Sequence, residues 1–586
     1  MPFIPPYGAA APITRNEFFQ MFMRCTPPSG WSPNSAIVVG NSGGPDSTCL
    51  LFLINQLLRD PSRKKTSKPL PPSAVSIAVD HDLQTISGSM ANRASITASF
   101  LDTKHLTLRI PWSVPPYPPK PAHGESMEQR ARAARYHMLF HGMTRVGADT
   151  IALGHHADDQ VETSLMRLAR GTTELGAGGM RRCRRWGMGF TANETDLGYS
   201  GLEGMKRWIV RPFLEVRKDR ILATCDANGL EYVNDPSNFQ PEITLRNAIR
   251  HMLDGEGSSD LADKLYRHRK PNNGALPPDI LNSLEKIKAA AAQLQSTVMD
   301  ISGGREQLRG AVKVLSSRVE DIDAQVTTHL KKHTLPSPPG TFLLSTHNLS
   351  TITDQTVRSA MVLRILRYIS FHPWGSVRAD GNRRDSSLQS IIKNLWTRDP
   401  WETPLRPFTA GSGVLWSPAI FNSERPLKVG AQYIKHSSHP GDRFAWLASR
   451  LPYVGVNKSG AGVQLPPNLD IDITTRLIPS PQNGQLKNVT QRYLDVLYDC
   501  RYLVRFDLQR IPGNVVTALQ QCSETSATVR VVPISRYCWP KVVLTPNQPA
   551  ESEVVLAALG EDGTCQHPDG TQPWITMEWI RLLDAT

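Results

Sequence analysis

The segment Asn41-Ser42-Gly43-Gly44-Pro45-Asp46-Ser47 combines residue types that can hold the phosphates of a nucleotide. An apolar run at 36–40 before it predicts a strand, and an apolar stretch at 48–58 after it predicts a helix. A glycine-rich turn between a strand and a helix points backbone N–H groups and the positive end of the helix dipole at an anion. The turn lacks the Gly-Lys-Ser/Thr ending of a Walker A motif. Taken alone, it fits a nucleotide site and a plain structural turn about equally well.

A second group of reactive residues, His155, His156, Asp158, Asp159 and Glu162, follows a predicted strand at 150–154. The spacing of three and four residues places Glu162 on the same helix face as both aspartates. Such carboxylates can hold Mg²⁺ or orient an amine nucleophile, although acids in a first helical turn also favour the helix dipole. Two adjacent histidines with three acids are more than a helix cap needs.

The elements that must position these residues alternate between strand and helix over about 30–255. Further strands are predicted at 74–79 and 106–110, and a charged helix at 128–140. This alternation predicts an α/β domain with a parallel sheet and helices on both faces. Ligands bind such sheets at the carboxyl ends of the strands, where the glycine loop, Asp80-His81 and Gly154-His155 would converge.

The chain of 586 residues is too long for one core. We predict an N-terminal extension at 1–30, the α/β domain at 31–255, a helical hairpin at 272–334 and a mixed α/β region at 335–586. Apolar residues at helical spacing predict the hairpin, and a Gly303-Gly304 pair separates its helices. We expect its apolar stripes to be packing surfaces.

The net charge of +13 suits a polyanionic partner, and nucleic acid is the commonest one, but charge alone does not decide this. The eight cysteines form no CxxC pair, which indicates scattered thiols rather than a zinc or iron–sulfur site. No apolar run approaches the roughly 20 residues that a membrane span needs.

Five ordered motifs between residues 36 and 253 resemble the tRNA(Ile)-lysidine synthases, a PP-loop family of the N-type ATP pyrophosphatases. They are the SGGxDS-type loop at 42–47, the E-x-x-A-R-x-x-R-Y pattern at 128–136, the HHxDDQxET core at 155–163, the R-P-L-L-like segment at 211–214, and D-P-S-N at 235–238 followed by R-N-x-I-R at 246–250. The organisation of the insertions and proline-rich loops predicts a eukaryotic, fungal-type organellar member.

The chain also departs from that family pattern. Asp80-His81-Asp82-Leu83-Gln84 stands where the family usually has D-H-G-L-R, so a contact made by the arginine is in doubt at Gln84. An arginine-rich insertion occupies 181–207. Its run Arg181–Trp186 fits either a clamp on the anticodon stem-loop or a solvated loop.

The resemblance implies a ligase that forms a carbon–nitrogen bond. ATP would adenylate the C2 oxygen of the wobble cytidine in tRNA(Ile) bearing CAU, releasing pyrophosphate. The amine of free L-lysine would then attack C2 and expel AMP, giving lysidine. The implied cofactors are ATP and Mg²⁺.

The resemblance also assigns roles to individual residues. Binding of ATP would fall to Ser42, Gly43, Gly44, Pro45, Asp46, Ser47, Asp80 and His81, with Asp46 also holding the metal. The catalytic set would be Asp46, His155, Asp159, Glu162 and Arg246. Contacts to the tRNA substrate would come from Arg132, Arg135 and Arg250.

Two other functions stay open at this point. A PP-loop tRNA 2-thiolation enzyme would use the same loop but needs cysteines or a cluster in its site. A degenerate homologue would bind tRNA without catalysis, and Gln84 leaves room for it, whereas the presence of Asp46, Asp159 and Glu162 argues against it. From the implied function we expect a mitochondrial location, otherwise a cytoplasmic one, with no membrane association. The oligomeric state is left open.

Overall fold

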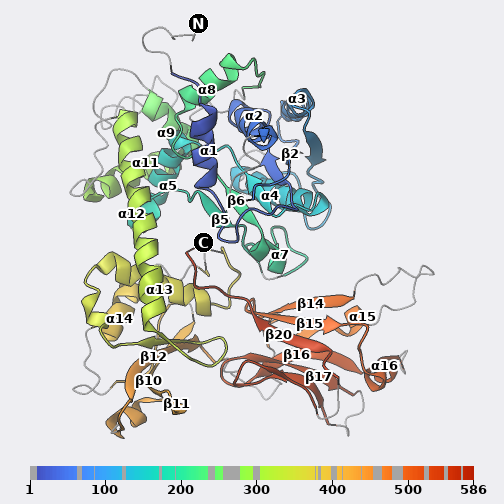
Figure 1. The fold of residues 1–586 in the computed structure, drawn as a ribbon, viewed down its shortest axis with the longest axis vertical. Coiled ribbons are helices and arrows are strands. Elements are labelled where there is room, and N and C mark those ends of the chain that lie inside the picture. Colours follow the sequence, from blue (N-terminus) through green and yellow to red (C-terminus); the bar gives the residue numbers. More distant parts are fainter. Residues whose placement is uncertain are drawn as a thin grey trace. The chain divides into compact units, whose positions relative to one another are not determined.

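The protein is described by a computed structural model (Figure 1). The residues that it describes are 10–61, 69–84, 86–121, 127–170, 174–191, 193–234, 245–254, 278–294, 304–376, 378–379, 385–396, 405–411, 413–436, 439–452, 465–477, 492–520, 527–546, 552–568 and 572–585. The chain divides into two compact units, 1–186 with 193–321 and 187–192 with 322–585. The finer division into 1–30, 31–255, 272–334 and 335–586 stays a prediction.

The first unit is built on a six-stranded sheet with the order β3-β2-β1-β4-β6-β5. The strands are β1 (Ile37–Gly40), β2 (Ala74–Asp80), β3 (Lys104–Arg109), β4 (Thr150–Ala152), β5 (Cys183–Arg185) and β6 (Trp208–Val210). Neighbours from β3 to β6 pair in parallel, which confirms the predicted parallel sheet. β5 pairs antiparallel with β6 and adds an edge strand that was not predicted. Because the chain leaves β1 on one side to β2 and returns on the other to β4, the carboxyl ends of β1 and β4 form a topological switch point.

Helices cover both faces of this sheet, as predicted (Figure 1). One face carries α1 (Arg15–Met23), α2 (Pro45–Arg59) and α8 (Lys218–Ala227), with α3 (Ser87–Phe100) beside α2. The other face carries α4 (Met127–Arg145). Side chains of a strand point alternately to the two faces, so Ile37 and Val39 enter the first core while Val38 enters the second.

A third core of the first unit joins α5 (Ala157–Leu168), α9 (Leu245–Asp254), α11 (Pro278–Leu294) and α12 (Gly304–His333). The two helices predicted within 272–334 are therefore present. Their apolar stripes, including Leu284 and Val312, are buried against Val161 and Leu165 of α5, which confirms the packing role expected for them. This unit also contains the short helices α6 (Glu174–Ala177) and α7 (Gly201–Lys206).

The second unit is a mixed α/β structure whose sheets are antiparallel. One sheet contains β7 (Thr334–Leu335), β8 (Phe342–Ser345), β9 (Phe408–Thr409), β10 (Val414–Asn422), β11 (Arg425–Val429) and β12 (Arg443–Arg450). A second contains β13 (Ile471–Asp472), β16 (Thr528–Ile534), β17 (Trp539–Thr545), β18 (Val554–Leu559) and β19 (Cys565–Gln566), and a third contains β14 (Tyr493–Tyr498), β15 (Tyr502–Asp507) and β20 (Ile575–Trp579). The helices are α13 (Gln355–Ile369), α14 (Asp385–Trp396), α15 (Thr474–Leu477) and α16 (Gly513–Gln520), with 3₁₀ turns at Leu349–Thr351 and Ala431–His436.

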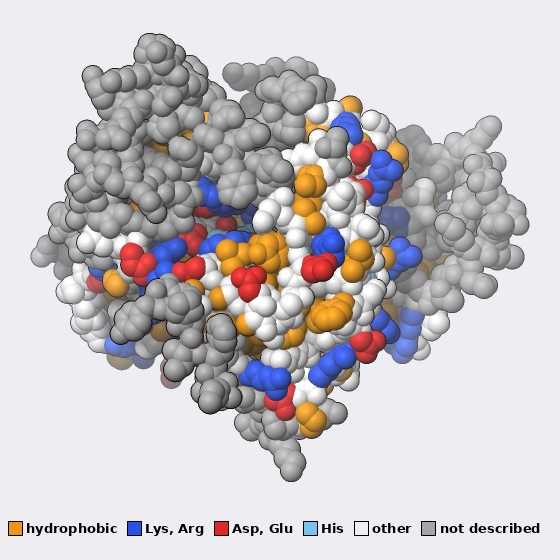
Figure 2. Space-filling view, turned by 90° about the horizontal axis from the view of Figure 1, so that it is seen from above, with side chains coloured by type: hydrophobic (Ala, Val, Ile, Leu, Met, Phe, Trp, Pro, Cys, Tyr) orange, Lys and Arg blue, Asp and Glu red, His pale blue; other side chains and the backbone are white. Residues whose placement is uncertain are grey.

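The surface does not separate the two signs of charge on the face that Figure 2 shows. There, Lys and Arg side chains lie next to Asp and Glu side chains over the described residues. The excess of positive charge is therefore not gathered into one patch on this face. Among the described helices, none has the length and apolar character that a membrane-spanning segment requires.

Candidate active site

The loop between β1 and α2 is held by the buried side chain of Asn41. Its Oδ1 accepts hydrogen bonds from the Gly43 N–H (3.0 Å) and the Ser47 Oγ (3.1 Å), and its Nδ2 donates to Ser76 Oγ on β2 (3.2 Å). The Ser42 N–H donates to Ser47 Oγ at 3.1 Å. These bonds fix the loop before any ligand arrives, so its backbone is preorganised.

Two glycines let this loop and the end of β4 approach each other and α3. Gly43 has φ +77°, and a Cβ there would collide with the carbonyl oxygen of Met90. A Cβ on Gly154 would lie 3.0 Å from the backbone of Asp46. Only glycine combines the left-handed conformation with this close approach at position 43.

Asp46 lies in the first turn of α2 and forms an ion pair with a lysine from α8. The Nζ of Lys218 is 2.5 Å from Asp46 Oδ1. His156 Nε2 lies 3.7 Å from the same oxygen. The Asp46 side chain is 30% exposed, so a ligand at the loop can reach it.

The first turn of α5 carries a capping box built by His156 and Asp159. Nδ1 of His156 accepts from the Asp158 N–H (3.3 Å), and Asp159 Oδ2 accepts from the His156 N–H (3.0 Å). Asp159 Oδ2 also lies 3.5 Å from His156 Nε2. One role of His156 and Asp159 is therefore to cap the N-terminus of α5. The His156 ring also connects Asp159 to Asp46, which a cap does not require.

His155 is half-buried, and its Nδ1 atom is shielded from solvent. Burial first, and then the charge of Arg211, lower its pKa to about 3. Its Nδ1 has no hydrogen-bond partner among the described residues. The ring is therefore neutral at physiological pH and offers one polar atom to a ligand. For Asp159, burial alone would raise the pKa, but the neighbouring His156 and His155 and the His156 N–H bond lower it overall, so this carboxylate stays ionised.

Glu162 lies one turn further along α5 and is 1% exposed. Its two oxygens accept from the Nε (2.8 Å) and an Nη (3.1 Å) of Arg250, and Arg246 Nε lies at 3.5 Å. Burial and the charge of Asp159 raise the pKa of Glu162, while Arg250 opposes that rise. The structure thus brings the predicted residues Asp159, Glu162, Arg246 and Arg250 together.

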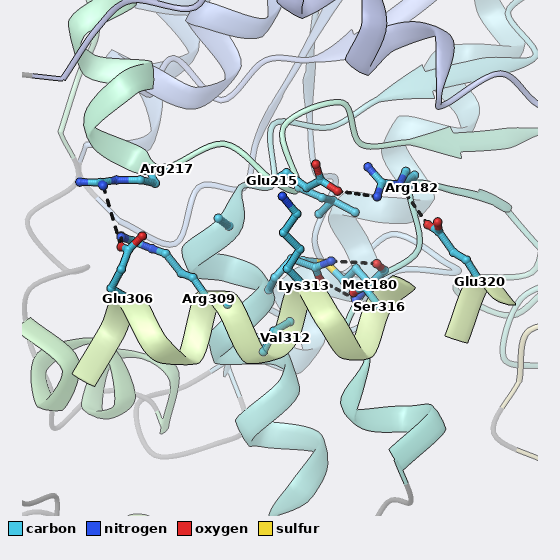
Figure 3. A pocket seen from close by; sticks show the side chains of 14 residues that line it. Met180, Arg182, Glu215, Arg217, Glu306, Arg309, Val312, Lys313, Ser316 and Glu320 are labelled. Carbon is cyan, nitrogen blue, oxygen red and sulfur yellow. Dashed lines mark hydrogen bonds and ion pairs between the residues drawn. The ribbon is translucent and has the colours of Figure 1, made fainter. Parts of the chain in front are cut away.

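Asp158, on the neighbouring side of α5, pairs with Arg309 from α12 at 2.6 Å and 2.9 Å and accepts from the Lys218 N–H at 3.3 Å. Arg309 and other residues of α12 line a cavity of about 240 Å³ (Figure 3). Across it, Arg182 bonds to Glu215 (2.6 Å) and Glu320 (3.0 Å). The Asp158–Arg309 pair attaches α12 to α5, and the Arg182–Glu320 pair attaches α12 to the residue before β5.

The remaining predicted residues lie in more local arrangements. Asp80 Oδ1 accepts from Ser87 Oγ (2.7 Å) and the Asp82 N–H (3.0 Å), and His81 Nδ1 accepts from the Leu83 N–H (3.2 Å), so both shape the turn after β2. On α4, Arg132 is half-buried and Arg135 is exposed. Gly44 is the N-cap of α2 and Pro45 is in its first turn. The predicted D-P-S-N segment at 235–238 lies outside the described residues.

The insertion at 181–207 is ordered where it is described. Arg185 stacks on Trp208 at 4.3 Å and donates to the Met205 carbonyl, while Trp186 packs 5.5 Å from Tyr136. With the Arg182 ion pairs, these contacts give much of the Arg181–Trp186 run partners inside the domain. The Arg181–Trp186 run is therefore not a solvated loop, which was one of the two forms predicted for it.

Sequence reasoning missed Lys218 and Arg309 at this site. Asn41 and Arg211 lay within motifs that the sequence analysis singled out, but neither was assigned a role. Lys218 and Arg309 sit on helices where a cation is normally solvated, and Arg309 is 151 positions from Asp158. Only the fold brings them to the acids.

The loop geometry and the sheet order define an ATP-binding domain of the PP-loop class. A family model described as a PP-loop domain matches residues 14–256. Among solved structures, the U34-tRNA thiolase NcsA from Methanococcus maripaludis matches 48% of this chain with 78% of its own. The TM-score is 0.30 and the sequence identity is 13%, and a similarity of that size supports no inference.

Curated relatives narrow the class to one family. The chain is 31% identical to the tRNA(Ile)-lysidine synthase of Methylobacterium nodulans over 50% of this chain and 76% of that protein. It is 33% identical to the enzyme of Rhodopseudomonas palustris, over 38% of this chain and 55% of that protein. It is 29% identical to the enzyme of Bacillus subtilis, over 50% of this chain and 58% of that protein. The chain therefore spans little more than half the length of these two relatives. It belongs to the tRNA(Ile)-lysidine synthase family, and so to the ligases that form carbon–nitrogen bonds.

Proposed function

We propose that this protein converts the wobble cytidine of a tRNA(Ile) with a CAU anticodon to lysidine, using ATP and free L-lysine. The observation that carries the proposal is the convergence of Asp46, Asp159 and Glu162 at the carboxyl ends of β1 and β4, beside a preorganised glycine loop. A domain that only binds tRNA has no need for three carboxylates at this point.

In the first step, the C2 oxygen of cytidine attacks the α-phosphorus of ATP and pyrophosphate leaves. The N–H groups of the loop and the N-terminus of α2 stabilise the charge that develops on pyrophosphate. Lys218 can exchange Asp46 for a phosphate oxygen, since the pair is at the partly exposed mouth of the loop. Asp46 also fits a Mg²⁺ ion that arrives with ATP, because this ion is usually held by one or two carboxylates together with substrate phosphates.

In the second step, the side-chain amine of lysine attacks C2 of the adenylated cytidine, the C2–O bond breaks as AMP leaves, and the carboxylates of Asp159 and Glu162 take up the proton that the amine loses. Asp159 provides an ionised carboxylate for an ammonium group of lysine, because the neighbouring His156 and His155 and the His156 N–H bond keep its pKa low. His155 can accept a hydrogen bond at Nδ1, but a pKa of about 3 makes it a poor base. Glu162 contributes through its pair with Arg250, which would have to loosen before Glu162 contacts lysine.

The geometry favours this reaction over 2-thiolation. The cysteines nearest the glycine loop are Cys49 on α2 and Cys225 on α8, and both are buried. Their mutual hydrogen bond, together with burial, raises the pKa of Cys49. A buried thiol that stays protonated is a poor sulfur carrier or metal ligand.

The test is a reaction of the full chain with ATP, Mg²⁺, isotope-labelled lysine and a tRNA(Ile) transcript bearing CAU, followed by nucleoside mass analysis. We expect labelled lysidine at the wobble position. It should be absent with a UAU transcript, without lysine, and with Asp46→Asn or Glu162→Gln. If the folded protein binds the transcript tightly but forms no lysidine, the proposal is wrong and the non-catalytic tRNA-binding function replaces it. The mitochondrial location stays a prediction, and the oligomeric state stays open.

A further inference from the structure

The α4 face of the sheet carries a group of arginines that have no role in the two steps described above, although Arg132 among them was predicted to contact the tRNA. We propose that Arg132, Arg184 and Arg211, which surround the hydroxyl of Tyr136, bind a phosphodiester of the RNA backbone next to the reacting cytidine. This inference rests on the proposed function, because it takes the substrate to be a single-stranded RNA loop. We call this group the arginine cage.

The register of the sheet places the cage beside the active site. Arg211 follows β6 directly, and the Leu153 N–H bonds to the Val210 carbonyl, so Arg211 lies next to the end of β4. Because alternate residues share a face, Arg211 and Ile209 point to the α4 side, and so does His155 two residues after Leu153.

β5 and α4 supply the other members of the cage. Arg184 is paired with Ile209 across the antiparallel ladder, and Trp186 on the same face packs against Tyr136. In a parallel β-α-β unit the helix runs opposite to the strands, so the first turns of α4 lie at their carboxyl ends. Arg132 is in the second turn of α4 and Tyr136 is one turn further, at the middle of the helix. The Arg132 guanidinium lies 5.2 Å from the Tyr136 ring, and one Nη lies 3.5 Å from its hydroxyl.

Arg211 gives the clearest evidence that a ligand belongs in the cage. Its side chain is 4% exposed, and its Nε has no hydrogen-bond partner among the described residues. Nη1 of Arg211 donates to the Arg181 carbonyl at 2.9 Å. Within the described part of the chain, neither Arg211 nor Arg132 pairs with a carboxylate, whereas Arg246 and Arg250 both face Glu162. Burial, with Arg184 next, lowers the pKa of Arg211 to about 10, as expected for crowded positive charge.

The position of the cationic groups favours a polymer over a small anion. Arg130 and Arg135 are exposed on α4, Arg132 is half-buried, and Arg211 is buried, so guanidinium groups run from the surface to the active site. A nucleic-acid backbone offers phosphates along such a line, and guanidinium groups match phosphate geometry. The carboxylate of free lysine would need only the innermost member.

Tyr136 gives the cage a measurable pH dependence. The charged groups facing its hydroxyl are Arg132 and Arg135 from α4, Arg184 from β5, and Arg211. Burial would raise the pKa of Tyr136, but these arginines lower it to about 8. Above that pH the phenolate occupies the cage as an internal anion and excludes phosphate. RNA affinity should then fall about tenfold between pH 7 and pH 9 if the two are mutually exclusive.

The experiment measures binding of a fluorescein-labelled anticodon stem-loop RNA bearing CAU to the full chain, by anisotropy from 50 to 300 mM KCl. Arg184→Met should weaken binding at least tenfold and reduce the slope of log K against log salt by about 0.7, the value for one phosphate contact on a single strand. Arg185→Met is the matched control, since its neighbouring guanidinium stacks on Trp208 instead, and it should keep the slope. Tyr136→Phe should abolish the loss of affinity between pH 7 and pH 9.

Three outcomes decide the inference. An unchanged affinity and slope in folded Arg184→Met, together with unchanged binding in Arg132→Lys, overturns it. A raised KM for lysine with normal RNA binding also overturns it and assigns the cage to the lysine carboxylate. If the slope falls as expected but the wild-type protein makes no lysidine, the cage is supported and only the proposed reaction fails. Thermal melting shows whether Arg211→Met, at a buried position, is folded enough to be included.

Discussion

Replacement of Arg309 by Met tests how far the active site depends on a helix outside the matched PP-loop domain. Arg309 is the cation of a buried pair with Asp158, at 2.6 Å and 2.9 Å, and Asp158 directly precedes the proposed lysine-binding Asp159. Met keeps most of the apolar stem of Arg309 but removes the charge. Asp158 would remain 7% exposed without its main counter-ion.

The expected cost follows from the state in which Asp158 is left. Removing one partner of a buried ion pair typically costs about 3–5 kcal/mol, because a charge stays buried without compensation. Asp158 keeps the hydrogen bond from the Lys218 N–H at 3.3 Å. This contact compensates part of the loss, so we expect about 3 kcal/mol, at the lower end of that range.

Hydrogen exchange of the α5 peptide is the appropriate assay, because a chain with two units need not unfold in a single transition. The free energy of local opening of Ala157–Leu168 should fall by about 3 kcal/mol in Arg309→Met. The double variant with Asp158→Asn should recover much of that loss, whereas Lys331→Met, at an exposed position of the same helix, should change it by less than about 0.5 kcal/mol. A change below about 1 kcal/mol in a folded Arg309→Met protein would refute the idea that this pair holds α5.

Three further predictions follow from the geometry of the loop and of α5. Gly43→Ala should abolish ATP-dependent pyrophosphate exchange, since its Cβ would meet the Met90 carbonyl at a φ of +77°, while Gly88→Ala, which meets open space, should leave exchange intact. Lys218→Met should raise KM for ATP at least tenfold with little effect on KM for lysine, because Lys218 sits 2.5 Å from Asp46 at the loop. Steady-state kinetics would measure both KM values, and an unchanged KM for ATP would contradict this prediction. A folded pKa of about 3 for His155, below the 6.5 of an exposed histidine, means that the unfolded chain takes up a proton first as pH falls, so stability is lost from pH 6.5 downward. Chemical denaturation would measure the free energy of unfolding at pH 6.5 and at pH 4.5. The decrease between these two values should be about 2–3 kcal/mol smaller in His155→Gln than in the wild type, and equal decreases would argue against a neutral ring.

The strand–loop–helix around Gly43 and the parallel sheet were predictable because both depend on local sequence. Apolar runs bounded by turns predict strands, and the capping residues of α5, His156 and Asp159, are only three positions apart in the chain. β5 was not predictable in this way. Its residues Cys183–Arg185 are polar for a strand, and their antiparallel pairing with β6 depends on contacts across the insertion.

The acidic half of the site could be predicted from spacing, whereas its cations could not. Asp158, Asp159 and Glu162 lie within five positions, so helical periodicity alone groups them. Their partners come from α8, α9 and α12, and the identity of a lysine or arginine says nothing about which distant acid it will meet. This is why Lys218 and Arg309 became visible only with the fold.

Three of the ion pairs at the site differ in how readily a substrate can replace them. The Asp158–Arg309 pair is 9% and 14% exposed by side chain and faces the interior of the α5–α12 contact, so it has a structural role. The Asp46–Lys218 pair is about one-third exposed on both sides and can be exchanged for phosphate and metal at little desolvation cost. The Glu162–Arg250 pair is intermediate, with a buried acid but an arginine that is 26% exposed. ATP can therefore bind by rearranging only the outermost pair, whereas lysine engages Glu162 only if Arg250 moves away from it. Arg250 is also one of the arginines predicted to contact the tRNA. Binding of the two substrates of the second step is thus expected to be coupled through Arg250.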